Sequence, residues 1–95
     1  MPKGYWVAHT QINDLIAYKE YQNANAKPLK KFGGKFLVRG GNQELREGQA
    51  KGRTVIIEFE NLSTAIACYE SAEYQAAKSL RTAIAEGDLV IVEGI

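Results

Sequence analysis

Three segments of this chain are bulky and apolar on both faces of an expected β-strand, and they constrain the fold more than any other feature. Residues 4–10, 53–59 and 88–93 are rich in aromatic or β-branched side chains, which favour strands. Successive side chains in a strand point to opposite faces of its sheet. A sheet made from these segments therefore has two apolar faces, and both must be covered.

A fourth strand is expected in the run Gly-Gly-Lys-Phe-Leu-Val-Arg-Gly-Gly at 33–41. Its second glycine pair, Gly40-Gly41, lies inside a longer extended segment that reaches Glu47. Glycine in that place indicates a bulge or a sharp bend and not a strand end. Together with the strand that follows, this segment predicts a hairpin over 35–59 whose first arm is long and bent.

Two helical regions connect the strands. The first begins at Asn13 or Asp14 and shows near-helical spacing of its apolar side chains. Pro28 disfavours helical geometry in the residue before it. This helix therefore either ends at Lys27 or kinks and continues to Lys31.

The second helical region begins at Asn61 or Ser63. Ser71 indicates a second N-cap, so we expect a break in the helix just before it. The remainder runs to Ala85, and Gly87 is expected to end it.

The order strand-helix-strand-strand-helix-strand predicts one α+β domain over residues 1–95. The expected architecture is ferredoxin-like, with a four-stranded antiparallel sheet and both helices on one face. Because two helices cover only one face, the other apolar face marks an interface. We therefore expect a homodimer that packs sheet against sheet around a two-fold axis, with the arm after Gly40 reaching toward the partner.

Composition argues against several classes of protein. Twelve basic and 11 acidic residues give a net charge of +1, which offers no electrostatic footprint for nucleic acid or for a membrane surface. No apolar run approaches the roughly 20 residues of a membrane span, and the N-terminus lacks the apolar core of a secretory signal. The single cysteine, Cys68, cannot form an internal disulfide and is expected to be buried. Together these features predict a soluble, cytoplasmic protein.

An ordered series of short motifs resembles a known family. The series consists of Gly-Tyr-Trp at 4–6, Tyr-Lys-Glu-Tyr at 18–21, the run at 33–41, Glu-Gly at 47–48, Ile-Glu-Phe at 57–59, Ser-Ala-Glu-Tyr-Gln at 71–75, Arg81 and Val-Glu-Gly at 92–94. As a set spread over essentially the whole chain, it resembles the small bacterial family catalogued as domain of unknown function thirteen-thirty.

This resemblance implies the dimeric α+β barrel fold and dimerisation. The same superfamily contains cofactor-free monooxygenases, muconolactone-type isomerases, stress-responsive barrels and haem-binding members. The resemblance implies no reaction, because the family has none assigned and a fold does not by itself set a function.

Two residues are candidates for proton transfer. His9 is the only histidine, and its ordinary titration range suits acid–base work at neutral pH. It shares a strand face with Tyr5 and Val7, near the strand end, where a pocket could open. The alternative is a hydrogen-bonded histidine without a catalytic role. Glu58 is either a general base or the ion-pair partner of an arginine.

Two arginines are candidates for substrate binding. Arg39 lies in an otherwise apolar strand, where an unpaired charge is costly. It either forms a structural ion pair with Glu58 or Glu93, within the chain or across the dimer, or it anchors a substrate carboxylate through two hydrogen bonds. Arg81 either extends past the edge of the core into solvent or points into the space between helices and sheet.

Aromatic side chains complete the candidate site. Trp6, Tyr18 and Tyr21 either wall a pocket for a flat apolar ligand or form ordinary core. One histidine and one cysteine far apart predict no zinc site, and the glycine pairs lack the spacing of a phosphate loop. We expect no metal and no cofactor. In a haem-binding variant of the hypothesis, His9 would be the axial ligand.

The candidates support two hypotheses of function. In the first, a small carboxylate-bearing or aromatic metabolite is bound or transformed between sheet and helices, in a monooxygenase- or isomerase-like reaction. Arg39 would anchor it, and His9 or Glu58 would move a proton. In the second, the protein is a non-catalytic ligand-binding or structural dimer in which Arg39 is held in an ion pair.

Overall fold

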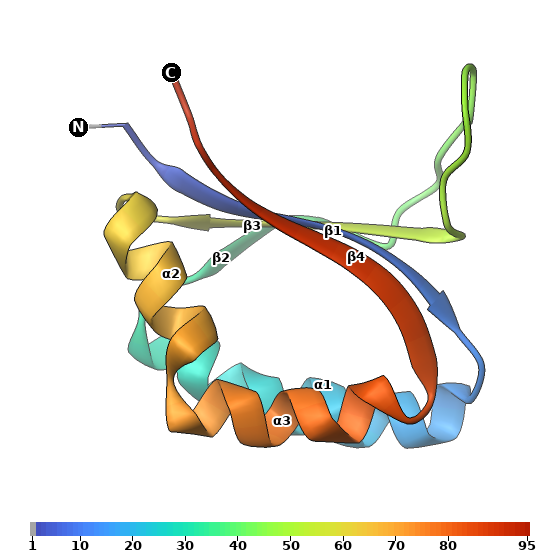
Figure 1. Cartoon of the computed structure of the whole chain (residues 1–95), viewed down its shortest axis with the longest axis horizontal. Helices are drawn as coiled ribbons and strands as arrows, with labels where there is room; N and C mark the ends of the chain where they lie inside the picture. Colours follow the sequence, from blue (N-terminus) through green and yellow to red (C-terminus); the bar gives the residue numbers. More distant parts are fainter. Residues whose placement is uncertain (1) are drawn as a thin grey trace.

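The computed structural model describes residues 2–95 as a four-stranded antiparallel sheet with every helix against one face (Figure 1). The elements in chain order are β1 (Gly4–Ile12), α1 (Leu15–Lys31), β2 (Lys35–Arg39), β3 (Arg53–Phe59), α2 (Leu62–Glu70), α3 (Ala72–Thr82) and β4 (Ala85–Glu93). The strand order is β2-β3-β1-β4. This confirms the predicted ferredoxin-like α+β fold. Within the described span, no helix is long and apolar enough to cross a membrane.

The register of the central strand β1 assigns each side chain to a face. Trp6 lies opposite Ile57 of β3 and Ile91 of β4, so these three share the helix-covered face. The residues directly before and after these three in each strand point to the opposite face of the sheet. We call that second side the open face, and it carries Tyr5, Val7 and His9 of β1, Thr54, Ile56 and Glu58 of β3, and Asp88, Val90 and Val92 of β4.

An aromatic cluster fills the space between the helices and the sheet. The Trp6 ring lies 4.8 Å from the ring of Tyr74 and 5.2 Å from that of Phe59, measured between centroids. The indole nitrogen of Trp6 donates a hydrogen bond of 2.9 Å to the backbone oxygen of Ala65, which ties β1 to α2. Because all four residues are at most 2% exposed, this cluster forms the centre of the core.

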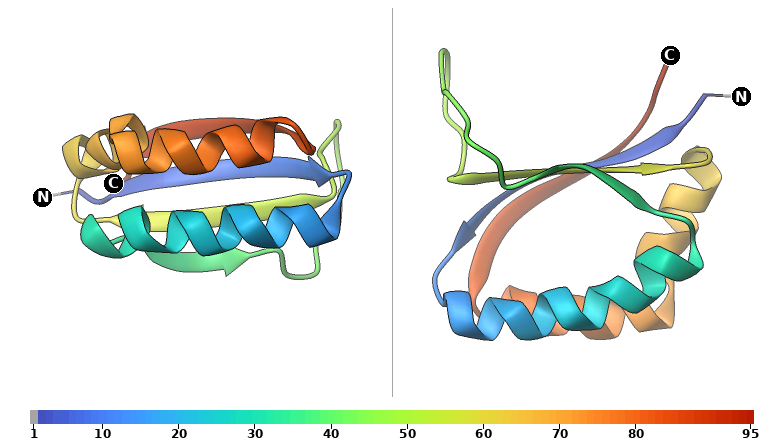
Figure 2. Two further views of the ribbon diagram at one scale, coloured as in Figure 1. Left: turned by 90° about the horizontal axis from the view of Figure 1, so that it is seen from below. Right: turned by 180° about the vertical axis from the view of Figure 1, so that it is seen from behind.

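The first helix takes the longer of the two expected courses. Asp14 is its N-cap and accepts hydrogen bonds from the backbone N–H groups of Ile16 and Ala17, both at 3.1 Å. The helix continues through Pro28 to Lys31 and bends toward the sheet near that end (Figure 2). Proline removes one helical hydrogen bond and so allows such a bend. Helices α1 and α3 lie side by side beneath the sheet (Figure 2).

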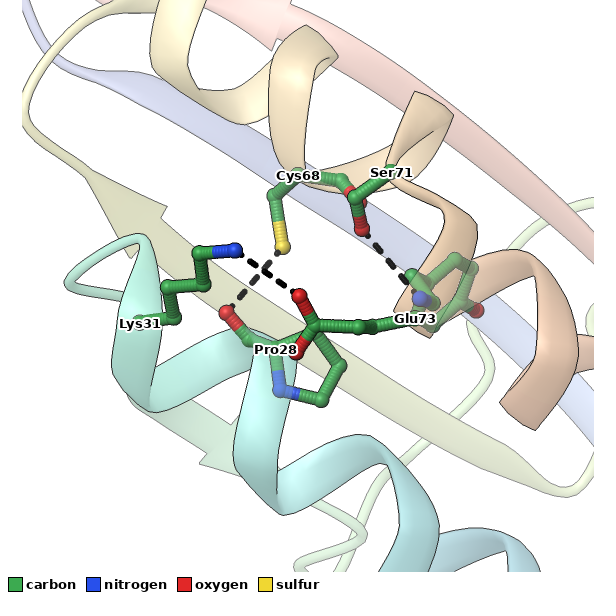
Figure 3. Close-up of polar contacts among 6 residues, drawn as sticks. Pro28, Lys31, Cys68, Ser71 and Glu73 are labelled. Carbon is green, nitrogen blue, oxygen red and sulfur yellow. Dashed lines mark hydrogen bonds and ion pairs between the residues drawn. The ribbon is translucent and has the colours of Figure 1, made fainter.

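The predicted break in the second helical region is confirmed. Ser71 separates α2 from α3, and its hydroxyl accepts from the N–H of Tyr74 at 3.2 Å and donates to the oxygen of Cys68 at 2.7 Å. Nearby, Lys31 of α1 forms an ion pair with Glu73 of α3 at 2.8 Å (Figure 3).

The buried Cys68 lies beside the first helix. Its Sγ atom is 3.7 Å from the backbone oxygen of Pro28 (Figure 3), and burial raises the pKa of its thiol to about 12. At neutral pH this thiol stays protonated, so it behaves as a small core side chain and not as a nucleophile.

Two predicted boundaries were wrong. Helix α3 ends at Thr82 and not at Ala85, which already belongs to β4. Gly87 is therefore a strand residue and not a helix stop. It lies opposite Thr10, where a Cβ atom would come within 2.9 Å of the backbone oxygen of His9. The glycine permits close contact between neighbouring strands.

The hairpin arm also differs from the prediction. β2 ends at Arg39, and residues 40–52 contain no regular secondary structure. The bend at Gly40 is present, with φ of +71°, but the irregularity in strand pairing lies earlier, between Phe36 and Val38. Residues 40–52, which we call the arm, project from the sheet on the side away from the helices (Figure 1).

The arm stands at one end of the open face. The two ends of the described chain project on the same side of the sheet, at its other end (Figure 1). Lys51 of the arm pairs with Asp88 of β4 at 2.6 Å, and Gln43 donates to the backbone oxygen of Lys51 at 2.9 Å. These contacts join the arm to the sheet where the open face is polar.

Candidate functional site

A pocket lies between the helix-covered face of the sheet and the helices α1 and α3. Its lining consists of Trp6, Ala8, Thr10, Tyr18, Tyr21, Gln22, Asn25, Phe36, Arg39, Arg53, Val55, Ile57, Arg81 and Leu89. About 470 Å³ of empty space lies between these walls when the open mouth is counted, but the cavity volume inside is only about 30 Å³. That interior has room for one or two water molecules.

The lining is unusual in its charge. It includes three arginines, and among the described residues it includes no aspartate, glutamate, histidine, lysine or cysteine. The arginines come from three different elements: Arg39 from the end of β2, Arg53 from the start of β3 and Arg81 from α3. The fold therefore brings together positive charges that are far apart in the sequence.

The strand irregularity explains how Arg39 enters this pocket. Phe36 pairs with Ile57 on the helix-covered face, and regular alternation would place Val38 on that face and Arg39 on the open face. The register shift after Phe36 reverses this order, so Arg39 pairs with Val55 on the helix-covered face. Re-aiming a side chain in this way is a common effect of a β-bulge.

Each arginine lies over an aromatic ring of the lining, in the geometry of a cation–π contact. The distances from guanidinium carbon to ring centroid are 4.3 Å for Arg39 over Phe36, 5.7 Å for Arg53 over Tyr18 and 5.5 Å for Arg81 over Tyr21. Within residues 2–95 none of the three is in an ion pair. The structural alternative for Arg39, an ion pair with Glu58 or Glu93, is therefore not found within the described chain.

Arg53 is the site residue that the sequence analysis missed. Its Nε atom is buried and has no hydrogen-bond partner among the described residues. Its guanidinium lies against the backbone of Gly40, where any Cβ atom would collide with Nη1. The sequence did offer one signal. Arg53 lies two residues before Val55, and alternation along the strand therefore places it on the same face as Val55, Ile57 and Phe59.

The tyrosine hydroxyls of the pocket have different environments. Burial raises the pKa of Tyr18, nearby Tyr21 adds to the rise, and the charges of Arg53 and Arg81 oppose it. Its hydroxyl thus lies within reach of two arginine charges. The Tyr21 hydroxyl instead forms a buried hydrogen bond of 2.9 Å with that of Tyr74. Tyr21 offers the pocket mainly its ring.

The remaining candidates lie on the other side of the sheet. His9 is on the open face, where its Nδ1 atom is 3.1 Å from the hydroxyl of Thr54. Glu58 is on the same face and accepts a hydrogen bond of 3.2 Å from the hydroxyl of Tyr5. The sheet separates both residues from the arginines. The structure thus brings together Trp6, Tyr18, Tyr21, Arg39 and Arg81, but not His9 or Glu58.

No metal-binding arrangement accompanies the pocket. Within the described part of the chain, no group of three or more histidine, cysteine, aspartate or glutamate side chains is placed to hold a metal ion. His9, the axial ligand expected in the haem-binding variant of the hypothesis, faces away from the aromatic pocket.

The family described as Domain of unknown function (DUF1330) matches residues 3–95. The chain belongs to this family. The resemblance recognised in the ordered motifs is thereby confirmed. No curated protein matches the chain.

Solved structures share the fold at low sequence identity. A protein of unknown function from Rhodopseudomonas palustris, RPA0582, is 14% identical with a TM-score of 0.80, and the match covers 99% of this chain and 83% of that one. A dimeric ferredoxin-like protein of unknown function from Jannaschia sp. CCS1 is 15% identical with a TM-score of 0.68 over 96% and 98% of the two chains. SnoaB, a cofactor-independent oxygenase from Streptomyces nogalater, is 9% identical with a TM-score of 0.64 over 97% and 92%. At these identities the likeness shows the fold alone.

The hydroxyl pair beneath the pocket yields a test of its construction. Replacing Tyr21 with Phe leaves the buried Tyr74 hydroxyl without its partner, so Tyr21→Phe should cost about 1–3 kcal/mol of unfolding free energy. Removing both hydroxyls avoids the orphaned group, so the double variant Tyr21→Phe/Tyr74→Phe should cost less than the sum of the two single variants. Urea unfolding of all four proteins measures this difference. Strictly additive costs would contradict the hydrogen bond.

Proposed function

We propose that this protein binds a small carboxylate-bearing metabolite in the pocket between its helices and its sheet. The observation that carries the proposal is the set of three arginines, which meet in one pocket without an acidic partner in the described chain. A guanidinium matches a carboxylate in shape and can donate two parallel hydrogen bonds to it. Arg39 and Arg81 are the anchors expected from the sequence, and Arg53 joins them.

Binding fits the lining better than acid–base catalysis does. His9 and Glu58, the expected proton-transfer groups, lie on the open face and cannot reach a ligand held beneath the sheet. The pocket itself offers only tyrosine hydroxyls for this task. Tyr18 has a raised pKa, so at neutral pH it is a hydrogen-bond donor to an anion and not a base. A monooxygenase- or isomerase-like reaction therefore has less support than ligand binding.

We further propose that two copies associate through their open faces to form a homodimer. Val90, Val92 and Val38 are 58%, 44% and 37% exposed there, although β-branched apolar side chains favour burial. The arm and the chain ends project on that same side and could flank a second sheet (Figure 1). The neighbour from Jannaschia sp. CCS1 is described as dimeric and has the same fold.

The binding proposal predicts that Arg39→Ala weakens a ligand without unfolding the protein. Trp6 is the only tryptophan and lines the pocket, so its fluorescence can report titrations with benzoate and succinate. Loss of a charge-assisted contact should raise the dissociation constant roughly 10- to 100-fold. The unfolding midpoint should stay near that of the parent, because Arg39 is exposed and has no ion pair in the described chain.

Arg46→Ala is the matched control. Arg46 is exposed in the arm and pairs with neighbouring Glu44, so its loss should leave both titrations unchanged. If Arg39→Ala instead lowers the unfolding midpoint and leaves binding intact, Arg39 has a structural role and the proposal is wrong.

The dimer proposal predicts a change of mass after a single charge is placed on the open face. Val90→Asp should convert a dimer into a monomer in sedimentation experiments at micromolar concentration, because an unpaired carboxylate cannot be buried between two sheets. Ile66→Asp is the control, since Ile66 is similarly apolar and 39% exposed but lies on α2. A parent protein that sediments as a monomer would refute the dimer.

A further inference from the structure

Each of the three arginines of the pocket contacts an aromatic ring and has no ion-pair partner in the described chain. A guanidinium that stacks on an aromatic ring uses its face for that contact and keeps its N–H groups, which lie in its plane. The guanidinium carbon of Arg39 lies 4.3 Å from the centroid of the Phe36 ring, which is close enough for such stacking, and Arg53 and Arg81 make longer contacts of 5.7 and 5.5 Å with Tyr18 and Tyr21. The aromatic rings of the lining therefore lie beside its cations.

No acidic side chain in the described lining balances the positive charge of its arginines. Three arginines and no acidic side chain give the described lining a formal charge of +3. Arg53 and Arg81 are half-buried, and like charges in such surroundings repel one another more strongly than in water. One carboxylate on a ligand would leave most of this charge uncompensated, whereas a ligand with two or more negative charges would compensate the larger part.

Arg53 has one nitrogen atom that no group of the described chain satisfies. Its Nε–H group is buried and has no partner in the described chain. Buried donors in folded proteins are normally satisfied, and an exception requires an explanation. Gly40 provides the space in which this guanidinium lies, since a side chain at that position would displace it. Gly40 thus leaves room for the charged end of Arg53 in the pocket lining.

The space in the pocket suits compact groups. A cavity volume of about 30 Å³ beneath a wider mouth admits a carboxylate or a phosphate group more readily than a fused ring system. The small interior and the three positive charges of the lining thus point to the same kind of ligand, one with a compact anionic group.

We propose that the metabolite bound here carries, besides its carboxylate, a second anionic group that is either another carboxylate or a phosphate, and that Arg39, Arg53 and Arg81 together select for this higher charge. The inference rests on the proposed function, because it concerns the occupant of the same pocket. It goes further by stating that the ligand has at least two negative charges and a compact charged end.

Two pairs of probes that differ in charge test this selection, and the members of the first pair also match closely in size. Succinate and succinamate form one pair, in which an amide replaces one carboxylate. Phosphoglycolate and glycolate form the second pair, which asks whether the second group is a phosphate. Titrations at constant ionic strength, followed by the fluorescence of Trp6, give the dissociation constants. We expect the more highly charged member of at least one pair to bind at least about tenfold more tightly.

Variants of each arginine connect the selection to this pocket. Arg39→Gln and Arg81→Gln should each reduce the preference for the more highly charged probe by at least about threefold, because each removes one positive charge. Arg53→Gln should reduce the preference in the same way, because Arg53 contributes the third positive charge of the lining. Arg46→Gln, in the arm, is the control and should change nothing.

The outcomes separate the two proposals. Tighter binding of succinate or phosphoglycolate, lost in the pocket variants, supports the inference, and the stronger pair identifies the second anionic group. Equal affinity within both pairs, or a preference that survives all three pocket substitutions, overturns the inference and leaves the proposed function standing. If neither these probes nor benzoate binds saturably, the proposed function fails and the inference fails with it.

Discussion

Contact between arginine and aromatic rings joins the core of this protein to its pocket. Tyr18 and Tyr21 are each 6% exposed and belong to the aromatic core, and Phe36 packs against its edge. The same rings support the three guanidinium groups that line the pocket. A ring that is fixed by core packing holds its arginine in place. Contact with a fixed ring restricts each arginine and so lowers the side-chain entropy that ligand binding would cost.

Backbone irregularities direct two of these arginines. The register shift after Phe36 turns Arg39 to the helix-covered face, and Gly40, with φ of +71°, leaves space for the guanidinium of Arg53. Both features interrupt an otherwise regular hairpin. Irregularities of this kind cost stability, and they are often found where a protein positions functional side chains. The two irregularities of the hairpin formed by β2 and β3 thus help to place Arg39 and Arg53 in the pocket lining.

The sequence was sufficient to predict the order of helices and strands, and to predict which side chains of a strand lie on the same face of the sheet. Alternation correctly grouped His9 with Tyr5 and Val7, and Ser71 correctly marked the break between helices. Alternation could not show which group the helices cover, because both faces of β1 carry bulky side chains. It also could not locate the register shift, because glycines suggested a bulge at Gly40. For these reasons His9 was expected near the pocket, and the pocket-facing position of Arg53 was overlooked.

The central claim is that three arginine side chains bind one anion together. The most direct measurement is a ¹H–¹⁵N spectrum of the arginine Nε–H groups during titration with succinate or phosphoglycolate. We expect the signals of Arg39, Arg53 and Arg81 to move and to saturate with a single dissociation constant. The signal of Arg46 should stay in place. Equal movement of all four signals, or no saturable movement of the first three, would contradict the central claim.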